Sequence, residues 1–237
     1  KKIYTVSDYL IDQLSKYGVR DVFGVPGDYV LSFFKKLENS KLKTIDTCDE
    51  QGAGFAADAY ARINGLGVVC ITYCVGGLKI VNTTAQAFAE KSPVIVISGA
   101  PGMNERKKKA LLHHKVKDFD TQLKIFEQIT VASTVLSDPS NACCEIERVI
   151  KAALKFKRPV YIELPRDVAS MPIKLCEGRC EEEKESDLNV LKEALQETTK
   201  IINNAKKPVI VAGVELHRFG LQKELLLFLE KTGIPVV

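Results

Sequence analysis

The chain has 237 residues, of which 46% are hydrophobic and 27% charged, enough apolar material for one large globular domain or slightly more. Its formal net charge is only +4 and it has no Trp, which argues against nucleic acid as a partner. No apolar run is long enough to span a bilayer and no signal-like segment opens the chain, so we expect neither secretion nor membrane insertion.

The first part of the chain alternates between helical periods and short apolar runs. Apolar residues at helical spacing predict a helix at 5–18, and the run 21–25 predicts a strand that ends in the turn Pro26-Gly27-Asp28. The alternation continues with predicted strands at 43–47, 67–73 and 94–98, and predicted helices at 30–37, 51–63 and 77–91.

Short, continuously apolar strands that alternate with helices are typical of a parallel sheet covered on both faces. We therefore predict an α/β protein with a doubly wound, mostly parallel sheet. Ligands of such sheets bind outside the carboxyl ends of the strands. Asp28, Glu50 and the segment 72–77 all follow predicted strands, so we expect them at that edge.

Residues 101–116 interrupt the alternation. They include a lysine run at 107–109, interpreted as a solvated face, and the adjacent histidines His113 and His114, and they predict an irregular excursion of the kind that often carries function. A helix at 119–126, a strand at 128–135, a helix at 141–156 and a strand at 159–164 are predicted to complete a first domain at 1–174.

The charge-rich stretch 175–187 lacks apolar periodicity and predicts a linker. Residues 188–237 then predict a helix at 189–203, a strand at 208–213, a helix at 221–232 and a strand-like end at 234–237. These elements cannot bury the core of a doubly wound domain. We therefore predict that the chain belongs to a longer protein whose second, Rossmann-like domain begins here.

The seven cysteines include the adjacent pair Cys143 and Cys144 and do not form the paired pattern of a disulfide framework, so a reducing cytoplasm is expected. Cys176 and Cys180 stand close in sequence, but no second Cys/His pair follows them at zinc-finger spacing. We expect no metal at these residues.

The polar residues at the predicted sheet edge each have a purely structural interpretation. Glu50 could do no more than stabilise the start of a helix, where the unpaired N–H groups and the macrodipole favour a carboxylate. Asp28 could likewise cap the helix that follows it. His113 and His114 could be two solvated loop residues. Adjacent side chains face one site only from irregular backbone, which also disfavours these histidines as a metal pair.

Four segments carry a family resemblance. They are Val22-Phe-Gly-Val-Pro-Gly-Asp28, Glu50 with Ala56-Ala-Asp-Ala-Tyr-Ala-Arg62, Leu111-Leu-His-His114, and Arg158-Pro-Val-Tyr-Ile-Glu-Leu-Pro165. On these segments, residues 4–174 resemble the aminopyrimidine-binding domain of thiamine-diphosphate enzymes, and among these the 2-keto acid decarboxylases of the pyruvate and indolepyruvate type. Residues 175–237 resemble the opening of the family's central domain.

The resemblance implies roles for particular residues. Glu50 is expected to hydrogen-bond N1′ of the cofactor's pyrimidine and make the 4′-nitrogen basic. Asp28, His113 and His114 are expected to handle protons during catalysis. The resemblance also implies that three further residues contact thiamine diphosphate: Pro26, Val75 and Gly76.

It further implies that Mg²⁺ and the diphosphate are held mainly by another domain, which a second subunit of a homodimer or homotetramer supplies. The whole enzyme would convert a 2-keto acid of the pyruvate, phenylpyruvate or indolepyruvate class into an aldehyde and carbon dioxide. Two alternatives stay open. One is a carboligase resembling acetolactate synthase, against which the double histidine argues, and the other is a non-catalytic cofactor-binding or dimerisation module.

The chain departs from the family after the third predicted strand, where related decarboxylases usually read Gly-Val-Gly-Glu-Leu and this chain reads Cys74-Val-Gly-Gly-Leu78. The thiol and the lost acid are expected to alter the fit of the cofactor or to strain the turn. Cys74 itself is interpreted as a small buried residue and not as a nucleophile.

Overall fold

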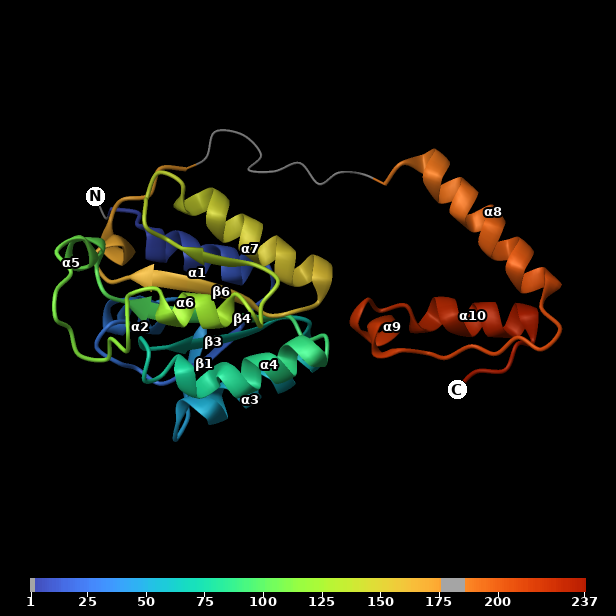
Figure 1. Ribbon diagram of the computed structural model, residues 1–237, viewed down its shortest axis with the longest axis horizontal. Helices are drawn as coiled ribbons and strands as arrows, with labels where there is room; N and C mark the ends of the chain where they lie inside the picture. Colours follow the sequence, from blue (N-terminus) through green and yellow to red (C-terminus); the bar gives the residue numbers. More distant parts are fainter. Residues whose placement is uncertain (1–2, 176–185) are drawn as a thin grey trace. The chain divides into compact units, whose positions relative to one another are not determined.

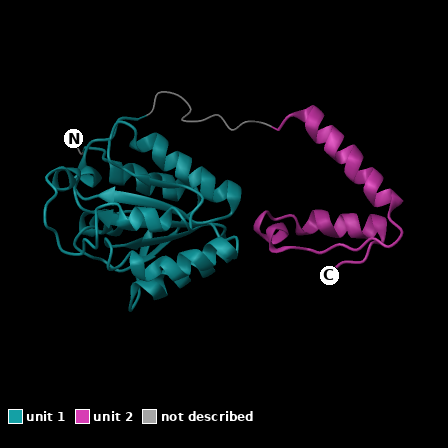
Figure 2. Ribbon diagram, viewed as in Figure 1, with its two compact units in different colours: residues 1–180 teal, residues 181–237 magenta. Residues whose placement is uncertain are grey.

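The computed structural model describes residues 3–175 and 186–237, which fall into the two compact units Lys1–Cys180 and Glu181–Val237 (Figures 1 and 2). Most of the predicted linker, together with Cys176 and Cys180, lies outside the described residues. No helix in the described parts of the chain is both long enough and apolar enough to cross a membrane.

The first unit is built on a six-stranded sheet in the order β2-β1-β3-β4-β6-β5, with every neighbouring pair parallel. The strands are β1 (Asp21–Gly24), β2 (Lys43–Asp46), β3 (Gly67–Ile71), β4 (Val94–Ala100), β5 (Ser133–Val135) and β6 (Val160–Pro165). The prediction of a doubly wound α/β sheet is therefore confirmed. The chain runs outward from β1 to β2 and returns to β3 on the other side of β1, so β1 and β3 flank the point where the winding reverses.

Helices cover both faces of the sheet (Figure 1). One face packs against α1 (Val6–Lys16), α2 (Leu31–Glu38) and α7 (Ala142–Phe156), and the other against α3 (Glu50–Asn64), α4 (Val81–Ala89) and α6 (Thr121–Phe126). Successive residues of a strand point to opposite faces, so Val68 of β3 belongs to the first core and Val69 to the second. Each large aliphatic side chain buried in this way contributes roughly 1.5–3 kcal/mol to stability.

Local sequence accounts for how several of these elements begin and end. α1 starts with a capping box in which the Thr5 hydroxyl accepts from the backbone of Asp8 while the Asp8 carboxylate accepts from the backbone of Thr5. It stops before Gly18, which adopts a φ of 85°. The small side chains of α3 let it lie close to the sheet, where a Cβ on Gly67 would come within 2.1 Å of the carbonyl of Ala57.

Some predicted elements differ from the structure. The helix expected at 77–91 is divided into a 3₁₀ turn, η1 (Leu78–Ile80), and α4, and the strand expected at 128–135 shrinks to β5. That shortening has a local cause, because the hydroxyl of Thr130 and the amide of Ile129 both donate to the carbonyl of Phe126 and prolong the end of α6. The excursion at 101–116 contains a short helix, α5 (Met103–Lys107), that the sequence did not indicate.

The second unit contains α8 (Leu188–Asn204), α9 (Val214–Arg218) and α10 (Gln222–Thr232), and no residue of these helices is buried. The strand expected at 208–213 and the strand-like end expected at 234–237 pair over a short length only: they share one parallel bridge, between Ile210 and Val236, and the amides of Ile210, Ala212 and Val237 form backbone hydrogen bonds between the two segments. A pair of strands without further neighbours is only marginally stable, which explains why the apolar runs do not extend into a ladder.

A second short 3₁₀ turn, η2 (Val168–Ser170), follows β6 in the first unit.

Candidate active site at the carboxyl edge of the sheet

The candidate residues gather where parallel strands end. Asp28 follows β1, Glu50 follows β2, and residues 72–77, hereafter the β3 turn, follow β3. Residues 101–120, hereafter the histidine loop, connect β4 to α6 and include α5. Because all strands run the same way, all four segments lie at one edge of the sheet.

Asp28 joins the two histidines. The Nε2 atom of His113 lies 2.5 Å from Oδ2 of Asp28, and Nδ1 of His114 lies 4.0 Å from Oδ1 of the same carboxylate. The backbone of His114 has a φ of 66°, in the left-handed region, and the two rings stand edge to face with centroids 4.5 Å apart. Adjacent histidines therefore do face one site, and the geometric objection to a shared metal ligand set does not hold in this structure.

The interpretation of Asp28 as a helix cap is wrong. The cap position of α2 is Val30, which makes no side-chain capping bond, and the Asp28 carboxylate faces the histidine loop instead. Tyr29 fixes the same loop, because its hydroxyl donates to the carbonyl of His113 at 3.0 Å and its ring stacks on the His113 imidazole at 5.1 Å. Burial raises the pKa of Tyr29, which keeps this hydroxyl protonated and able to donate.

Glu50 is the first residue of α3 but not its cap. The cap is Asp49, whose Oδ1 accepts from the amide of Gly52 at 2.7 Å, so the interpretation of Glu50 as a cap is wrong, although Glu50 does stand in the first turn, where the macrodipole favours a carboxylate. The side chain of Glu50 is 17% exposed, and its Oε2 lies 3.3 Å from the ammonium of Lys79. Lys79 also contacts Asp49 at 3.2 Å, and that contact raises the pKa of Lys79. Glu50 thus pairs with Lys79, while Asp28 pairs with the histidines.

The β3 turn carries the departure from the family pattern. Cys74 adopts a φ of 50°, where an L side chain is strained, and its thiol is buried, which raises its pKa and disfavours the reactive thiolate. A Cβ on Gly77 would lie 2.0 Å from Oε1 of Gln122, so the acid usual in related decarboxylases would require the Gln122 carboxamide to move. Val75 projects with 54% of its surface exposed, whereas Gly76 is buried and Pro26 is exposed.

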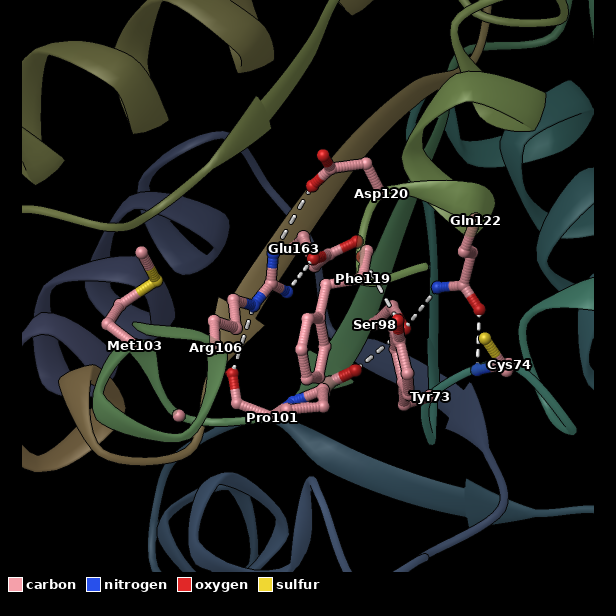
Figure 3. Close-up of polar contacts among 12 residues, drawn as sticks. Tyr73, Cys74, Ser98, Pro101, Met103, Arg106, Phe119, Asp120, Gln122 and Glu163 are labelled. Atoms are coloured by element: carbon pink, nitrogen blue, oxygen red, sulfur yellow. Dashed lines mark hydrogen bonds and ion pairs between the residues drawn. The ribbon is translucent and has the colours of Figure 1, made fainter. Parts of the chain in front are cut away.

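A buried polar network lies behind the turn (Figure 3). The carboxamide of Gln122, on α6, accepts from the amide of Cys74 at 2.6 Å and donates to the hydroxyl of Ser98 at 2.7 Å and to that of Tyr161 at 2.7 Å. The Tyr161 hydroxyl in turn donates to Glu163 at 2.6 Å. The network thus links the end of β3 to β4, α6 and β6.

Glu163 is fully buried on β6 and faces Arg106 of α5, which forms an ion pair with it (Figure 3). Burial raises the pKa of Glu163, although the guanidinium of Arg106 opposes that shift. Arg106 also donates to the carbonyl of Pro101 at 3.3 Å, so the ion pair fastens the start of the histidine loop to the sheet. The sequence analysis missed both residues, although an acid inside the apolar strand β6 indicates a buried charge that needs a partner.

These residues fit the pyrimidine half of thiamine diphosphate. Glu50 offers a largely buried carboxylate for a ring nitrogen, and the exposed side chain of Val75 offers an apolar surface for a ring. One contact opposes this fit, because Lys79 already lies against the Glu50 carboxylate. Lys79 is 43% exposed, so its ammonium can turn into solvent when another donor takes its place.

Comparison with known proteins agrees with this fit. Residues 4–124 match the model of the thiamine pyrophosphate enzyme N-terminal TPP binding domain, and residues 195–237 match the model of the thiamine pyrophosphate enzyme central domain. Both models describe thiamine pyrophosphate enzymes, which implies thiamine diphosphate, another name for the same molecule, as the cofactor.

Curated relatives match over nearly the whole chain. The chain is similar to an indole-3-pyruvate decarboxylase of Azospirillum brasilense, with 39% identity over 98% of this chain and 43% of the relative. It is also similar to a pyruvate decarboxylase of Aspergillus parasiticus, with 36% identity over 97% of this chain and 41% of the relative. An alpha-keto-acid decarboxylase of Mycobacterium leprae is 34% identical over 98% of this chain and 41% of the relative. The chain thus spans about two fifths of the length of these relatives.

Proposed function

The chain belongs to the thiamine pyrophosphate enzymes, and we propose that it supplies the aminopyrimidine side of the active site of a 2-keto acid decarboxylase. The observation that carries the proposal is the shared contact of Asp28 with His113 and His114 at the sheet edge that also presents Glu50. In the full-length protein that contains this chain, the reaction would release carbon dioxide and an aldehyde from pyruvate, phenylpyruvate or indolepyruvate.

Each residue has a distinct part in the proposal. When bound, thiamine diphosphate supplies a carbon nucleophile and accepts the electron pair that the departing carboxylate leaves behind. Glu50, whose side chain is only 17% exposed, would hold the pyrimidine through a charge-assisted hydrogen bond. Pro26, Val75 and Gly76 line the same edge and would contact the ring.

Asp28, His113 and His114 would move protons. The 2.5 Å contact between Asp28 and His113 lets one proton be shared or passed, and imidazoles are suited to proton transfer near neutral pH. The second imidazole, His114, turns its buried Nδ1 atom toward the other oxygen of the same carboxylate, and this atom has no hydrogen-bond partner among the residues that the structure describes.

We further propose that Mg²⁺ and the diphosphate are bound mainly outside this chain, by a second subunit in a homodimer or homotetramer located in the cytoplasm. The direct test is an assay of the full-length protein with thiamine diphosphate, Mg²⁺ and each of pyruvate, phenylpyruvate and indolepyruvate. Formation of an aldehyde from at least one substrate is expected. Absence of aldehyde from all three would overturn the proposal, and formation of an acyloin or acetohydroxy acid instead would favour the carboligase.

For the 237-residue chain alone, we propose a binding or dimerisation module without turnover. It presents pyrimidine-facing residues, and its matches are to N-terminal and central domains. Calorimetric titration of the chain with thiamine diphosphate should show weak binding or none. Tight binding would contradict this part of the proposal and would show that the diphosphate also finds ligands here.

A further inference from the structure

We propose that Gln122 is a positioning residue that fixes the β3 turn and joins it to the histidine loop. The inference rests on the proposed function only for the roles of the two segments: the β3 turn would contact the pyrimidine, and the histidine loop carries the imidazoles that would handle protons. Through Gln122, the two parts of the site would hold their geometry as one unit.

The carboxamide of Gln122 can take only one orientation. The backbone amide of Cys74 can only donate, so it must face Oε1, at 2.6 Å. The amide nitrogen then faces the hydroxyls of Ser98 and Tyr161, each at 2.7 Å, and both hydroxyls can accept. Gln122 is fully buried, so water does not compete for these bonds.

The Cys74 amide depends on Gln122 more than the two hydroxyls do. Ser98 still donates to the carbonyl of Gly99, and Tyr161 still donates to Glu163, when the carboxamide is removed. The Cys74 amide would lose its partner inside the protein, and an unpaired buried donor is costly. The effect of removing the carboxamide should therefore concentrate at the left-handed residue of the β3 turn.

The same residue borders the histidine loop. Gln122 lies directly after this loop, at the start of α6, and the neighbour of Cys74 contacts the loop as well, since the hydroxyl of Tyr73 donates to the carbonyl of Phe119 at 3.0 Å. The Tyr73 ring meets the Tyr29 ring edge to face at 5.7 Å, and Tyr29 holds His113. A continuous set of contacts thus runs from Gln122 through the turn to the imidazoles.

The chain contains its own reporters for a test. Cys74 and Cys70 are both free and fully buried, whereas Cys48 is free and exposed. His113 and His114 report on the loop, and His217, the third histidine, lies in the other unit. We would compare two variants. Gln122→Met keeps the size of the side chain and removes its polar group, and the control, Gln128→Met, makes the same change at an exposed position just after α6.

Alkylation of the 237-residue chain, mapped by peptide mass spectrometry, gives the first readout. In Gln122→Met, the thiol of Cys74 should react about tenfold faster than in the unmodified chain, with no change at Cys70. The ring resonances of His113 and His114 should shift while those of His217 stay in place. Gln128→Met should change neither readout.

An unchanged Cys74 rate, equal acceleration at Cys70, or unchanged imidazole resonances at positions 113 and 114 would overturn the proposal. If Gln122→Met does not fold, Ser98→Ala removes one acceptor of the carboxamide, leaves the bond between Tyr161 and Glu163 in place, and should produce the same changes to a smaller degree. No change in Ser98→Ala would then overturn the proposal equally. None of these readouts needs cofactor or turnover. A protein that makes no aldehyde would therefore overturn the proposed function and leave the role of Gln122 standing.

Discussion

Asp28 and His113 are 85 residues apart in the sequence, yet the Nε2 atom of His113 lies 2.5 Å from Oδ2 of Asp28. The pair forms because β1 and β4 end at the same edge of the sheet and the left-handed backbone of His114 lets both imidazoles face one carboxylate.

Replacing this carboxylate should impair catalysis without unfolding the protein. Asp28→Asn keeps the size of the side chain but removes its charge and its capacity to accept a proton, so kcat of the full-length protein should fall by about 10²–10⁴-fold. Asp12→Asn is the control, because Asp12 pairs with the hydroxyl of Tyr4 and not with the histidines. Steady-state kinetics with the best substrate measure both. An unchanged kcat in Asp28→Asn would remove Asp28 from the proton-handling role.

Replacing the adjacent acids Asp49 and Glu50 should have opposite effects: the change at Glu50 should remove activity, and the change at Asp49 should lower stability. Glu50→Gln should abolish aldehyde formation in the full-length protein and leave the melting temperature nearly unchanged, because Glu50 is not the cap. Asp49→Ala removes the bond to the Gly52 amide and should cost about 0.5–2 kcal/mol of stability while kcat is retained. Thermal unfolding and activity assays on both variants decide the matter, and near-normal turnover in Glu50→Gln would contradict its assignment.

Lys79 should weaken the binding of thiamine diphosphate, because its ammonium competes with the pyrimidine for the Glu50 carboxylate. Its ammonium lies 3.3 Å from Oε2 of Glu50 and must leave that carboxylate when the pyrimidine binds. A partly exposed ion pair of this kind contributes about 0.2–1 kcal/mol, so Lys79→Met should raise the apparent affinity of the full-length protein for thiamine diphosphate by a few-fold. Lys43→Met, at the exposed start of β2, should not. A lower affinity in Lys79→Met would show instead that the ammonium helps to bind the cofactor.

Breaking the ion pair between Arg106 and Glu163 should make the free energy of unfolding depend on pH. Arg106→Met leaves a buried carboxyl group without its counter-charge and should cost roughly 3–5 kcal/mol at neutral pH. Burial raises the pKa of Glu163 above its value in the unfolded chain, so the folded variant binds more protons than the unfolded chain between the two values. Its free energy of unfolding should be highest below the unfolded pKa and should be lost as pH rises through the folded pKa.

Urea unfolding between about pH 4 and pH 8 measures this slope, relative to the unmodified chain. The double variant Arg106→Met with Glu163→Gln lacks the titrating group and should lose the additional pH dependence. A slope that persists in the double variant would assign it to another group.

The arrangement of the sheet and the position of its candidate residues could be predicted because each depends on short-range patterns. Continuous apolar strands alternating with helices indicate parallel pairing, and parallel pairing places Asp28 and Glu50 at one edge. The partners of these residues could not be predicted in the same way. Asp49 and Glu50 are adjacent acids at a helix start, and only the backbone geometry decides that Asp49 is the cap.

Other features depend on contacts between distant residues and leave little trace in local sequence. Gln122 is one amide among many, and its role becomes visible only when the β3 turn is seen to donate to it. The apolar run 208–213 resembles a strand, but a long strand requires neighbours, and within the described residues this run pairs only with 235–237, through one bridge and three backbone hydrogen bonds.

The separation between Asp28 and His113 also bears on synthesis of the protein. On the ribosome the carboxylate emerges long before either imidazole, and β6, which carries Glu163, emerges later still. The early segment thus cannot form the contact between Asp28 and the imidazoles before the histidine loop has been made. Glu163 enters the sheet only after the loop that carries its partner Arg106 is already present.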